Sequence, residues 1–192
     1  IIKRLQDMLQ EHRWHQKKII VAVSGGADSM VLAALLQQLQ ITISIAHCNF
    51  GLRGKESDED EAMVVSWAAA QGIPCRVQRF DTRAQLDSQG GNLQEIAREL
   101  RYQWFEELRL ETGFDLIATA HHSQDSVETM LINFFKGTGI AGMHGILPQQ
   151  HKIIRPLLTF TKEELQQYAQ DHQVPWREDS SNQKDDYTRN AV

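Results

Sequence analysis

The sequence is poor in cysteine, and its two cysteines, Cys48 and Cys75, are too far apart to form a CxxC motif. A disulfide framework, a four-thiolate zinc site and a CxxC thiol-transfer motif are therefore excluded. This cysteine usage fits a reducing cytosol. No apolar run reaches the roughly 18 residues that a membrane-spanning helix needs. We therefore expect a cytoplasmic protein with no membrane partner.

Positive charge is also scarce, because 20 Lys and Arg residues stand against 25 Asp and Glu residues, which gives a net charge of −5. This balance argues against a protein that binds nucleic acid by electrostatic attraction over its whole surface. A local basic site is still compatible with the net negative charge. The 192 residues match a single domain, which at this length buries a sizeable core without disulfides or a structural metal.

Short apolar runs alternate with helical patterns along the chain. Such strands and helices form βαβ units, so we expect an α/β fold: a doubly wound, mainly parallel five-stranded sheet with helices on both faces. The predicted strands are residues 19–23, 41–46, 75–80, 115–120 and 153–154. The predicted helices are about residues 1–17, 30–39, 57–72, 92–111, 123–136 and 161–172.

Three polar stretches follow predicted strands, at residues 24–29, 47–54 and 121–128. In an open parallel sheet, ligands bind beyond the carboxyl ends of the strands. The sequence therefore predicts a binding site where these three stretches meet.

The stretch 24–29, Ser-Gly-Gly-Ala-Asp-Ser, carries the strongest functional signal. Its glycines allow a sharp turn, its serines add hydroxyl donors, and the next helix directs its positive end to the same place, which together suit a phosphate. A Walker loop would have Lys where this loop has Asp28. A carboxylate there makes sense if it holds Mg²⁺ against phosphates. The alternative is a glycine turn in which Asp28 only caps the helix.

The third stretch contains His121, Asp125 and Glu128, whose i, i+4 and i+7 spacing predicts a shared helix face. One interpretation is a transition-metal site. A second is a polar helix start, in which the carboxylates complement the helix dipole. A third, which the nearby phosphate loop favours, is that Asp125 joins Asp28 on Mg²⁺ while the histidines contact nucleotide or activated substrate.

The hexapeptide at 24–29 resembles the PP-loop of the N-type ATP pyrophosphatases, which split ATP between its α and β phosphates. Further blocks make nearly the whole chain similar to the tRNA(Ile)-lysidine synthetase branch of that family. Phe50 stands where the branch often has His, so that position has no proton-transfer role here, and Lys136 stands where it has Arg. The blocks are residues 47–53 with Ser57 and Asp60, 98–102, 120–129, 136–139, 155–158, 179–182 and 189–190.

The resemblance implies an adenine nucleotide alpha hydrolase-like fold over residues 1–192, without the tRNA-binding domains that follow in the family. It also implies a set of site residues. The catalytic residues would be Asp28, Asp125, Arg98 and Arg101, with Asp28 and Asp125 as the Mg²⁺ ligands. ATP would contact Ser24, Gly25, Gly26, Ala27, Asp28, Ser29, His47, His121 and His122. Substrate or tRNA would contact Asn49, Arg53, Glu128, Lys136, Arg155 and Arg189. For Arg98 and Arg101, a solvated or salt-bridged surface role stays open.

The reaction implied by the resemblance is ligation of free L-lysine to the wobble cytidine of a tRNA(Ile) with a CAU anticodon, with ATP and Mg²⁺. ATP adenylates the C2 oxygen of cytosine, and the lysine ε-amine then displaces AMP. Rival functions are a tRNA-thiolating PP-loop enzyme, which usually needs sulfur-handling cysteines, and a non-catalytic ATP-binding module. A glutamine-dependent amidating enzyme would need an ammonia-supplying domain. A homodimer stays open.

Overall fold

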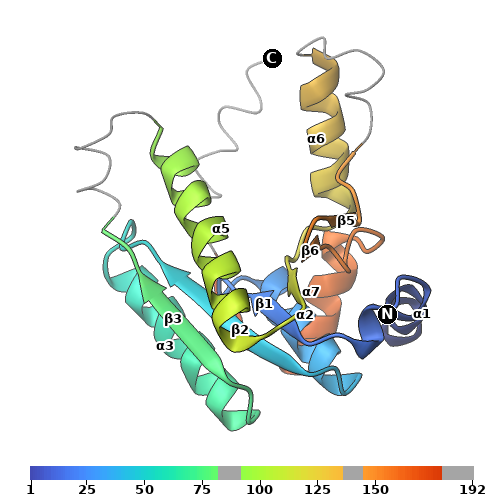
Figure 1. The fold of residues 1–192 in the computed structure, drawn as a ribbon, viewed down its shortest axis with the longest axis horizontal. Coiled ribbons are helices and arrows are strands. Elements are labelled where there is room, and N and C mark those ends of the chain that lie inside the picture. The colour runs from blue at the N-terminus through green and yellow to red at the C-terminus, as the bar shows by residue number, and fades with distance from the viewer. Residues whose placement is uncertain (82–91, 136–144, 179–192) are drawn as a thin grey trace.

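The computed structural model describes residues 1–81, 92–135 and 145–178, and a mainly parallel sheet runs through its centre (Figure 1). The strand order is β3-β2-β1-β4-β6-β5, with every neighbouring pair parallel except β5 and β6. The strands are β1 (Ile19–Ala22), β2 (Ile43–Asn49), β3 (Cys75–Arg79), β4 (Leu116–Ala118), β5 (Gln149–Gln150) and β6 (Ile153–Ile154).

The five predicted strands all form, and the predicted mainly parallel α/β sheet is confirmed. The sheet gains one further strand, β5, which pairs antiparallel with β6. Its two glutamines are exposed and carry no hydrophobic pattern, so no sequence signal indicates this strand.

Helices cover both faces of the sheet. They are α1 (Ile2–Glu11), α2 (Ala27–Gln38), α3 (Lys55–Ala70), α5 (Leu93–Thr112), α6 (Ser123–Phe135) and α7 (Lys162–Asp171), with a 3₁₀ turn η1 (Trp14–Gln16). In Figure 1, α5 crosses one face of the strands, α2 and α3 lie on the other, and α6 extends away from the sheet. No helix in the described ranges has the length and apolarity to cross a membrane.

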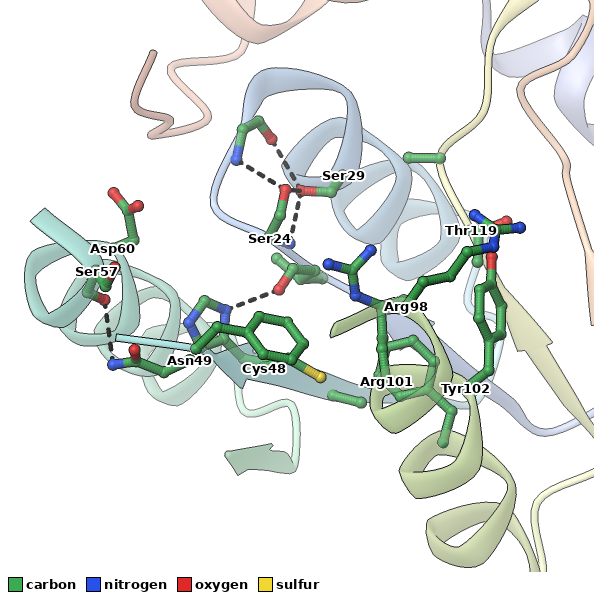
Figure 2. A pocket seen from close by; sticks show the side chains of 18 of the residues that line it. Ser24, Ser29, Cys48, Asn49, Ser57, Asp60, Arg98, Arg101, Tyr102 and Thr119 are labelled. Carbon is green, nitrogen blue, oxygen red and sulfur yellow. Dashed lines mark hydrogen bonds between the residues drawn. The ribbon is translucent and has the colours of Figure 1, made fainter. Parts of the chain in front are cut away.

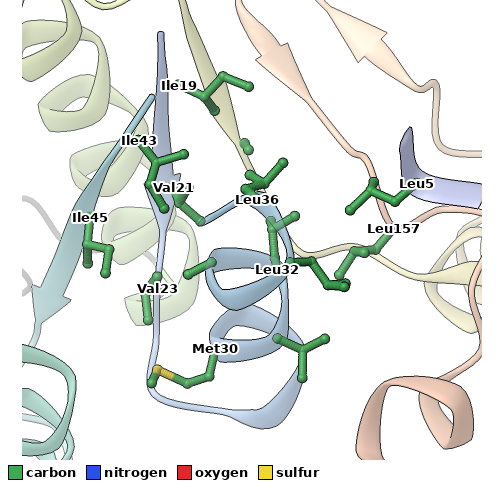
Figure 3. Packing of buried hydrophobic residues seen from close by; sticks show 14 of the residues in the cluster. Leu5, Ile19, Val21, Val23, Met30, Leu32, Leu36, Ile43, Ile45 and Leu157 are labelled. Carbon is green, nitrogen blue, oxygen red and sulfur yellow. The ribbon is translucent and has the colours of Figure 1, made fainter. Parts of the chain in front are cut away.

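The alternation of side chains along β1 divides the core between the two faces. Ile19 and Val21 point into the larger cluster, where they meet Leu32 and Leu36 of α2 (Figure 3). Ile20 points the other way, into a smaller cluster that contains Phe105 and Leu108 of α5. All three strand residues are fully buried, as expected of a strand covered by helices on both sides.

Three element boundaries differ from the predicted ones by three residues or more. The first helix ends at Glu11 rather than residue 17. Arg13 adopts a left-handed conformation there (φ 58°), and Trp14 turns inward to be 2% exposed and to donate an indole hydrogen bond to Gln149. Helix α2 begins at Ala27, three residues early, so the second half of the polar loop is its first turn. Strand β2 runs on to Asn49.

The strand order places the predicted site at a topological switch point. From β1 the sheet grows to β2 and β3 on one side and to β4 and β6 on the other. The loops after β1 and β4 are therefore neighbours, and ligands bind in such crevices in open α/β sheets.

Candidate active site

The loop between β1 and α2 is held in a tight turn by its own serines (Figure 2). The Ser24 N–H donates to Ser29 Oγ (3.1 Å), the Gly26 N–H donates to Ser24 Oγ (3.3 Å), and the Ser29 hydroxyl donates to the Gly26 carbonyl (2.9 Å). Gly25 has φ 99°, a backbone conformation that side chains other than glycine rarely adopt. Ser29 is buried while Ser24 is exposed, so Ser24 is the serine whose hydroxyl a ligand can reach.

Helix α2 begins directly at this loop with no side-chain cap on its first turn. The first N–H groups of a helix have no intrahelical partners and carry the positive end of the dipole. An anion seated on the loop would satisfy them. The loop thus has the geometry that the predicted phosphate cradle requires, a helix N-terminus joined to a glycine turn, and phosphate binding there stays a prediction.

Asp28 and Asp125 are brought together around His122. His122 Nε2 lies 3.6 Å from Asp28 Oδ2, and His122 Nδ1 lies 3.6 Å from Asp125 Oδ2. Asp125 also accepts the backbone N–H of His122 (2.9 Å), so it serves the start of α6 as the second interpretation predicted. Burial raises the pKa of Asp28, opposed by the charges of His122 and Lys162.

The predicted face of His121, Asp125 and Glu128 does not form, because His121 lies before the first residue of α6. His122, not His121, contacts Asp125. Glu128 is exposed. Within the described ranges, no three His, Cys, Asp or Glu residues gather in a way that would hold a metal ion by themselves.

The carboxylate of Asp28 nevertheless fits a cation that phosphates help to hold. Its Oδ1 is buried and has no hydrogen-bond partner, which is costly for an ionised oxygen. Mg²⁺ commonly binds through one or two carboxylates plus substrate phosphates, without an all-protein cage. The residues present are therefore compatible with Mg²⁺ on Asp28, with Asp125 near by.

Two histidines of the site are held in their neutral form. His47 is 2% exposed, and its Nδ1 lies 2.8 Å from the Val23 carbonyl, an acceptor, so Nδ1 carries the proton and Nε2 is an acceptor. His121 Nδ1 contacts the Thr119 hydroxyl at 3.0 Å. Burial lowers the pKa of both rings. Neutral imidazoles suit contacts to a nucleotide base better than to phosphate.

Arg98 and Arg101 extend from one side of α5 over aromatic rings rather than toward carboxylates. The guanidinium carbon of Arg98 lies 4.9 Å from the ring centre of Tyr102, and that of Arg101 lies 5.2 Å from Phe50. Figure 2 shows both arginines on the side of the site that faces Ser24 and Ser29. Cations placed over rings stay available to an anion.

These elements enclose a cavity of about 640 Å³, within the size range of small-ligand pockets. Its lining combines the polar phosphate loop and Asp28 with the arginines of α5 and with the apolar or aromatic side chains Leu93, Tyr102 and Phe105. A lining that mixes polar, cationic and apolar side chains suits a molecule that joins phosphates to a base.

Asn49 and Arg53, predicted to contact substrate, line this cavity but also have partners inside the protein. The Asn49 amide donates to Glu61 (2.8 Å) and Asp58 (3.1 Å). Arg53 donates to Asp60 (2.7 Å). Their substrate contacts stay predictions.

Arg155 lies away from the cavity lining. It is 6% exposed, donates to the Leu147 carbonyl (2.8 Å), and its pKa is lowered by burial, which are marks of a structural arginine. Its predicted tRNA contact stays a prediction. Lys136 and Arg189 lie outside the described residues.

Sequence reasoning missed two contributors to the site. Thr119 fixes the His121 ring. Arg177 contacts both the phosphate loop and α3. Neither belongs to a motif, and the partners of Arg177 lie more than 100 positions away in the sequence, so only the folded chain shows them.

The fold and the site define a class of protein. A glycine turn between the central strand and helix of a doubly wound sheet, with a desolvated carboxylate and facing arginines, is a nucleotide-binding α/β domain. The model of the PP-loop domain matches residues 1–192, and the chain belongs to the PP-loop family.

Relatives found by sequence similarity indicate which branch of the family the chain resembles. The tRNA(Ile)-lysidine synthases of Chlorobaculum tepidum, Bacteroides thetaiotaomicron and Bacillus subtilis are 44%, 44% and 40% identical to the chain and cover 91%, 91% and 98% of it. The chain covers 54%, 41% and 42% of those proteins, so it spans about half of their length.

Solved structures share the fold at low identity. The U34-tRNA thiolase of Methanococcus maripaludis superimposes with a TM-score of 0.75 at 19% identity, over 92% of this chain and 64% of that one. The NH3-dependent NAD synthetase of Campylobacter jejuni superimposes with a TM-score of 0.62 at 15% identity, over 88% of this chain and 70% of that one. At these identities the likeness shows the α/β fold alone.

Proposed function

We propose that this chain is the ATP-pyrophosphatase domain of a tRNA(Ile)-lysidine synthase. The observation that carries the proposal is the phosphate loop after β1, opposed by Arg98 and Arg101 across one cavity. The relatives that are 40–44% identical, all named tRNA(Ile)-lysidine synthase, support the choice of substrate. The tRNA substrate in turn makes the cytoplasm the proposed location.

The proposed reaction has two steps. The C2 oxygen of the wobble cytidine, in a CAU anticodon, attacks the α-phosphorus of ATP, and the bond to the β-phosphate oxygen breaks to release pyrophosphate. The ε-nitrogen of free lysine then attacks C2, loses a proton, and the C2–O bond breaks so that AMP leaves with the oxygen. Lysidine is the product.

The chain's own residues position the phosphates for the first step. The uncapped N–H groups at the start of α2 and the Ser24 hydroxyl would bind the pyrophosphate portion. Mg²⁺, when bound by Asp28 with Asp125 near by, would neutralise charge on the phosphate oxygens. The desolvated Asp28 carboxylate is suited to this role because its buried Oδ1 has no partner within the protein.

The residues across the cavity from the phosphate loop would bind the base and stabilise the charge that develops on the α-phosphate. Arg98 and Arg101 are held over rings and would stabilise that charge or stack on cytosine. Neutral His47 offers Nε2 as an acceptor, which suits an exocyclic amine of a base. The apolar side chains of the lining, among them Leu93 and Phe105, would help to exclude water from the activated base.

The direct test is incorporation of radiolabelled lysine into an unmodified tRNA(Ile) transcript with a CAU anticodon. Label in tRNA that depends on ATP and lysine supports the proposal. A transcript with U at the wobble position is the matched control and should take up no label. Labelling of both transcripts, or of neither at saturating tRNA, contradicts the proposed substrate. Transfer of sulfur instead would identify a thiolating enzyme.

A further inference from the structure

Arg177 connects the last described segment to the phosphate loop by its backbone. Its N–H donates to the Gly25 carbonyl at 3.0 Å. Gly25 is the residue of the loop with positive φ, and the direction of its carbonyl helps to fix the direction of the N–H groups that follow. A contact to that carbonyl therefore acts on the shape of the whole turn.

The side chain of Arg177 is fixed by two carboxylates of α3. Its Nε lies 2.7 Å from Asp60 Oδ1, and its terminal nitrogen lies 2.7 Å from Glu59 Oε2. Asp60 is 6% exposed, and its other oxygen accepts from Arg53 at 2.7 Å. Charge-assisted bonds to a buried carboxylate hold a guanidinium in one place.

Helix α3 packs directly against the loop at the same point. A side chain built at Gly25 would meet the Cβ of Asp60 at 3.4 Å and Val64 at 3.7 Å. Asp60 therefore supports the loop from one side, while the backbone of Arg177 holds its carbonyl and the Arg177 guanidinium binds Asp60. Loop, helix and C-terminal segment form one closed set of contacts.

We propose that Arg177 is a positioning residue, which preorganises the phosphate loop for the pyrophosphate portion of ATP. It acts through Gly25 and Asp60 and does not touch the ligand. A loop without this support has to be ordered during binding, and that conformational cost weakens affinity. The identity of the ligand rests on the proposed function, whereas the role of Arg177 rests on the contacts above.

The test is calorimetric titration of the 192-residue chain with α,β-methylene-ATP and Mg²⁺. Arg177→Gln is expected to raise the dissociation constant about tenfold, the equivalent of losing one good charge-assisted hydrogen bond. The binding stoichiometry is expected to stay near one per chain. Arg177→Lys keeps the charge but cannot span two carboxylates. Its dissociation constant is expected to lie between those of the unmodified chain and of Arg177→Gln.

Stoichiometry separates positioning from a general loss of structure. A variant that only misfolds in part lowers the number of sites and leaves the dissociation constant of the rest unchanged, and that result would overturn the inference. Should Arg177→Gln fail to fold, Glu59→Ala removes one half-buried partner and is expected to weaken binding about twofold to threefold. Unchanged affinity in that variant would then be decisive against the inference.

Arg4 provides the matched control. It makes two contacts to Glu164, at 2.9 and 2.8 Å, which join α1 to α7, and is similarly exposed. Arg4→Gln is expected to bind the analogue as the unmodified chain does, and weakening equal to that of Arg177→Gln would count against a specific role for Arg177. If the unmodified chain itself binds no analogue, the proposed function fails and this inference fails with it. If it binds and Arg177→Gln binds equally well, only the inference fails.

Discussion

Under the proposed function, Asp28 is the residue whose substitution we expect to affect the chemistry most. A carboxylate in a phosphate loop repels the ligand unless a cation lies between them, and burial already raises the pKa of this one. The protein thus keeps a group that is unfavourable for folding, as is common at functional sites.

Asp28→Asn is expected to lower tRNA-dependent pyrophosphate release by at least about 100-fold, since one charge-bearing group in a phosphoryl-transfer site is commonly worth that much. The fold should be retained, because the amide keeps the shape and removes a charge that burial disfavours. Pyrophosphate release and a circular dichroism melt measure the two effects. Turnover close to that of the unmodified chain, in a folded variant, contradicts the role of Asp28.

The two thiols should be inert in the folded protein. Burial raises the pKa of Cys48 to about 12 and that of Cys75 to about 11. The reactive form is the thiolate, so at pH 8 both thiols are almost entirely in the unreactive, protonated form. A thiol reagent should label neither cysteine within minutes in buffer and both in denaturant. Rapid labelling of the native chain would reopen a role in sulfur chemistry.

Among the secondary-structure elements, the starts of helices are specified largely by local sequence. The capping box at α7 is complete: Thr161 Oγ1 accepts the Glu164 N–H at 3.2 Å, and the Glu164 carboxylate accepts the Thr161 N–H at 2.8 Å. Asn92 likewise caps α5, because its side chain accepts the Gln94 N–H. A cap depends on residues within one turn, which is why sequence alone finds it.

Thr161→Ala is expected to lower the free energy of unfolding by about 1 kcal/mol, the usual cost of losing a Thr cap. Thr159→Ala makes the same chemical change at a nearby exposed position and should stay within about 0.5 kcal/mol of the unmodified chain. Urea denaturation measures both. Equal destabilisation by the two substitutions would mean that the cap does not contribute as expected.

Contacts between distant elements account for what the sequence could not predict. The phosphate loop could be predicted because its residues are contiguous and chemically distinctive. The placement of His122 between Asp28 and Asp125 could not, because it depends on how the end of β4 approaches α2. The same holds for the Arg177 contacts to Gly25 and Asp60. Strand β5 was missed because its pairing, not its composition, makes it a strand.

Across the whole molecule, the fold concentrates positive charge at one cavity of a protein that is acidic overall. The arginines of α5 face the cavity, whereas the chain as a whole carries a net charge of −5. Such a surface attracts a small nucleotide locally but offers few cations to a long phosphate backbone.

We therefore expect the chain to hold tRNA weakly, with a logarithmic salt slope of no more than about 3, because each phosphate neutralised adds about 0.7 to 0.9. The Bacillus subtilis relative, of which the chain covers 42%, should bind more tightly and with a steeper slope. Filter binding of isoleucine and methionine tRNAs over a salt series measures both proteins. Equal affinity and slope would show that this domain alone supplies the electrostatic contacts.

The central claim, that the site cleaves ATP between the α and β phosphates, is tested most directly by the products of ATP labelled at the α-phosphate. The chain is incubated with Mg²⁺, lysine and a saturating amount of the CAU transcript, and the nucleotides are separated by thin-layer chromatography. The account predicts that the label appears in AMP, in step with pyrophosphate release, and that omission of tRNA abolishes it. Label appearing mainly in ADP would contradict the account.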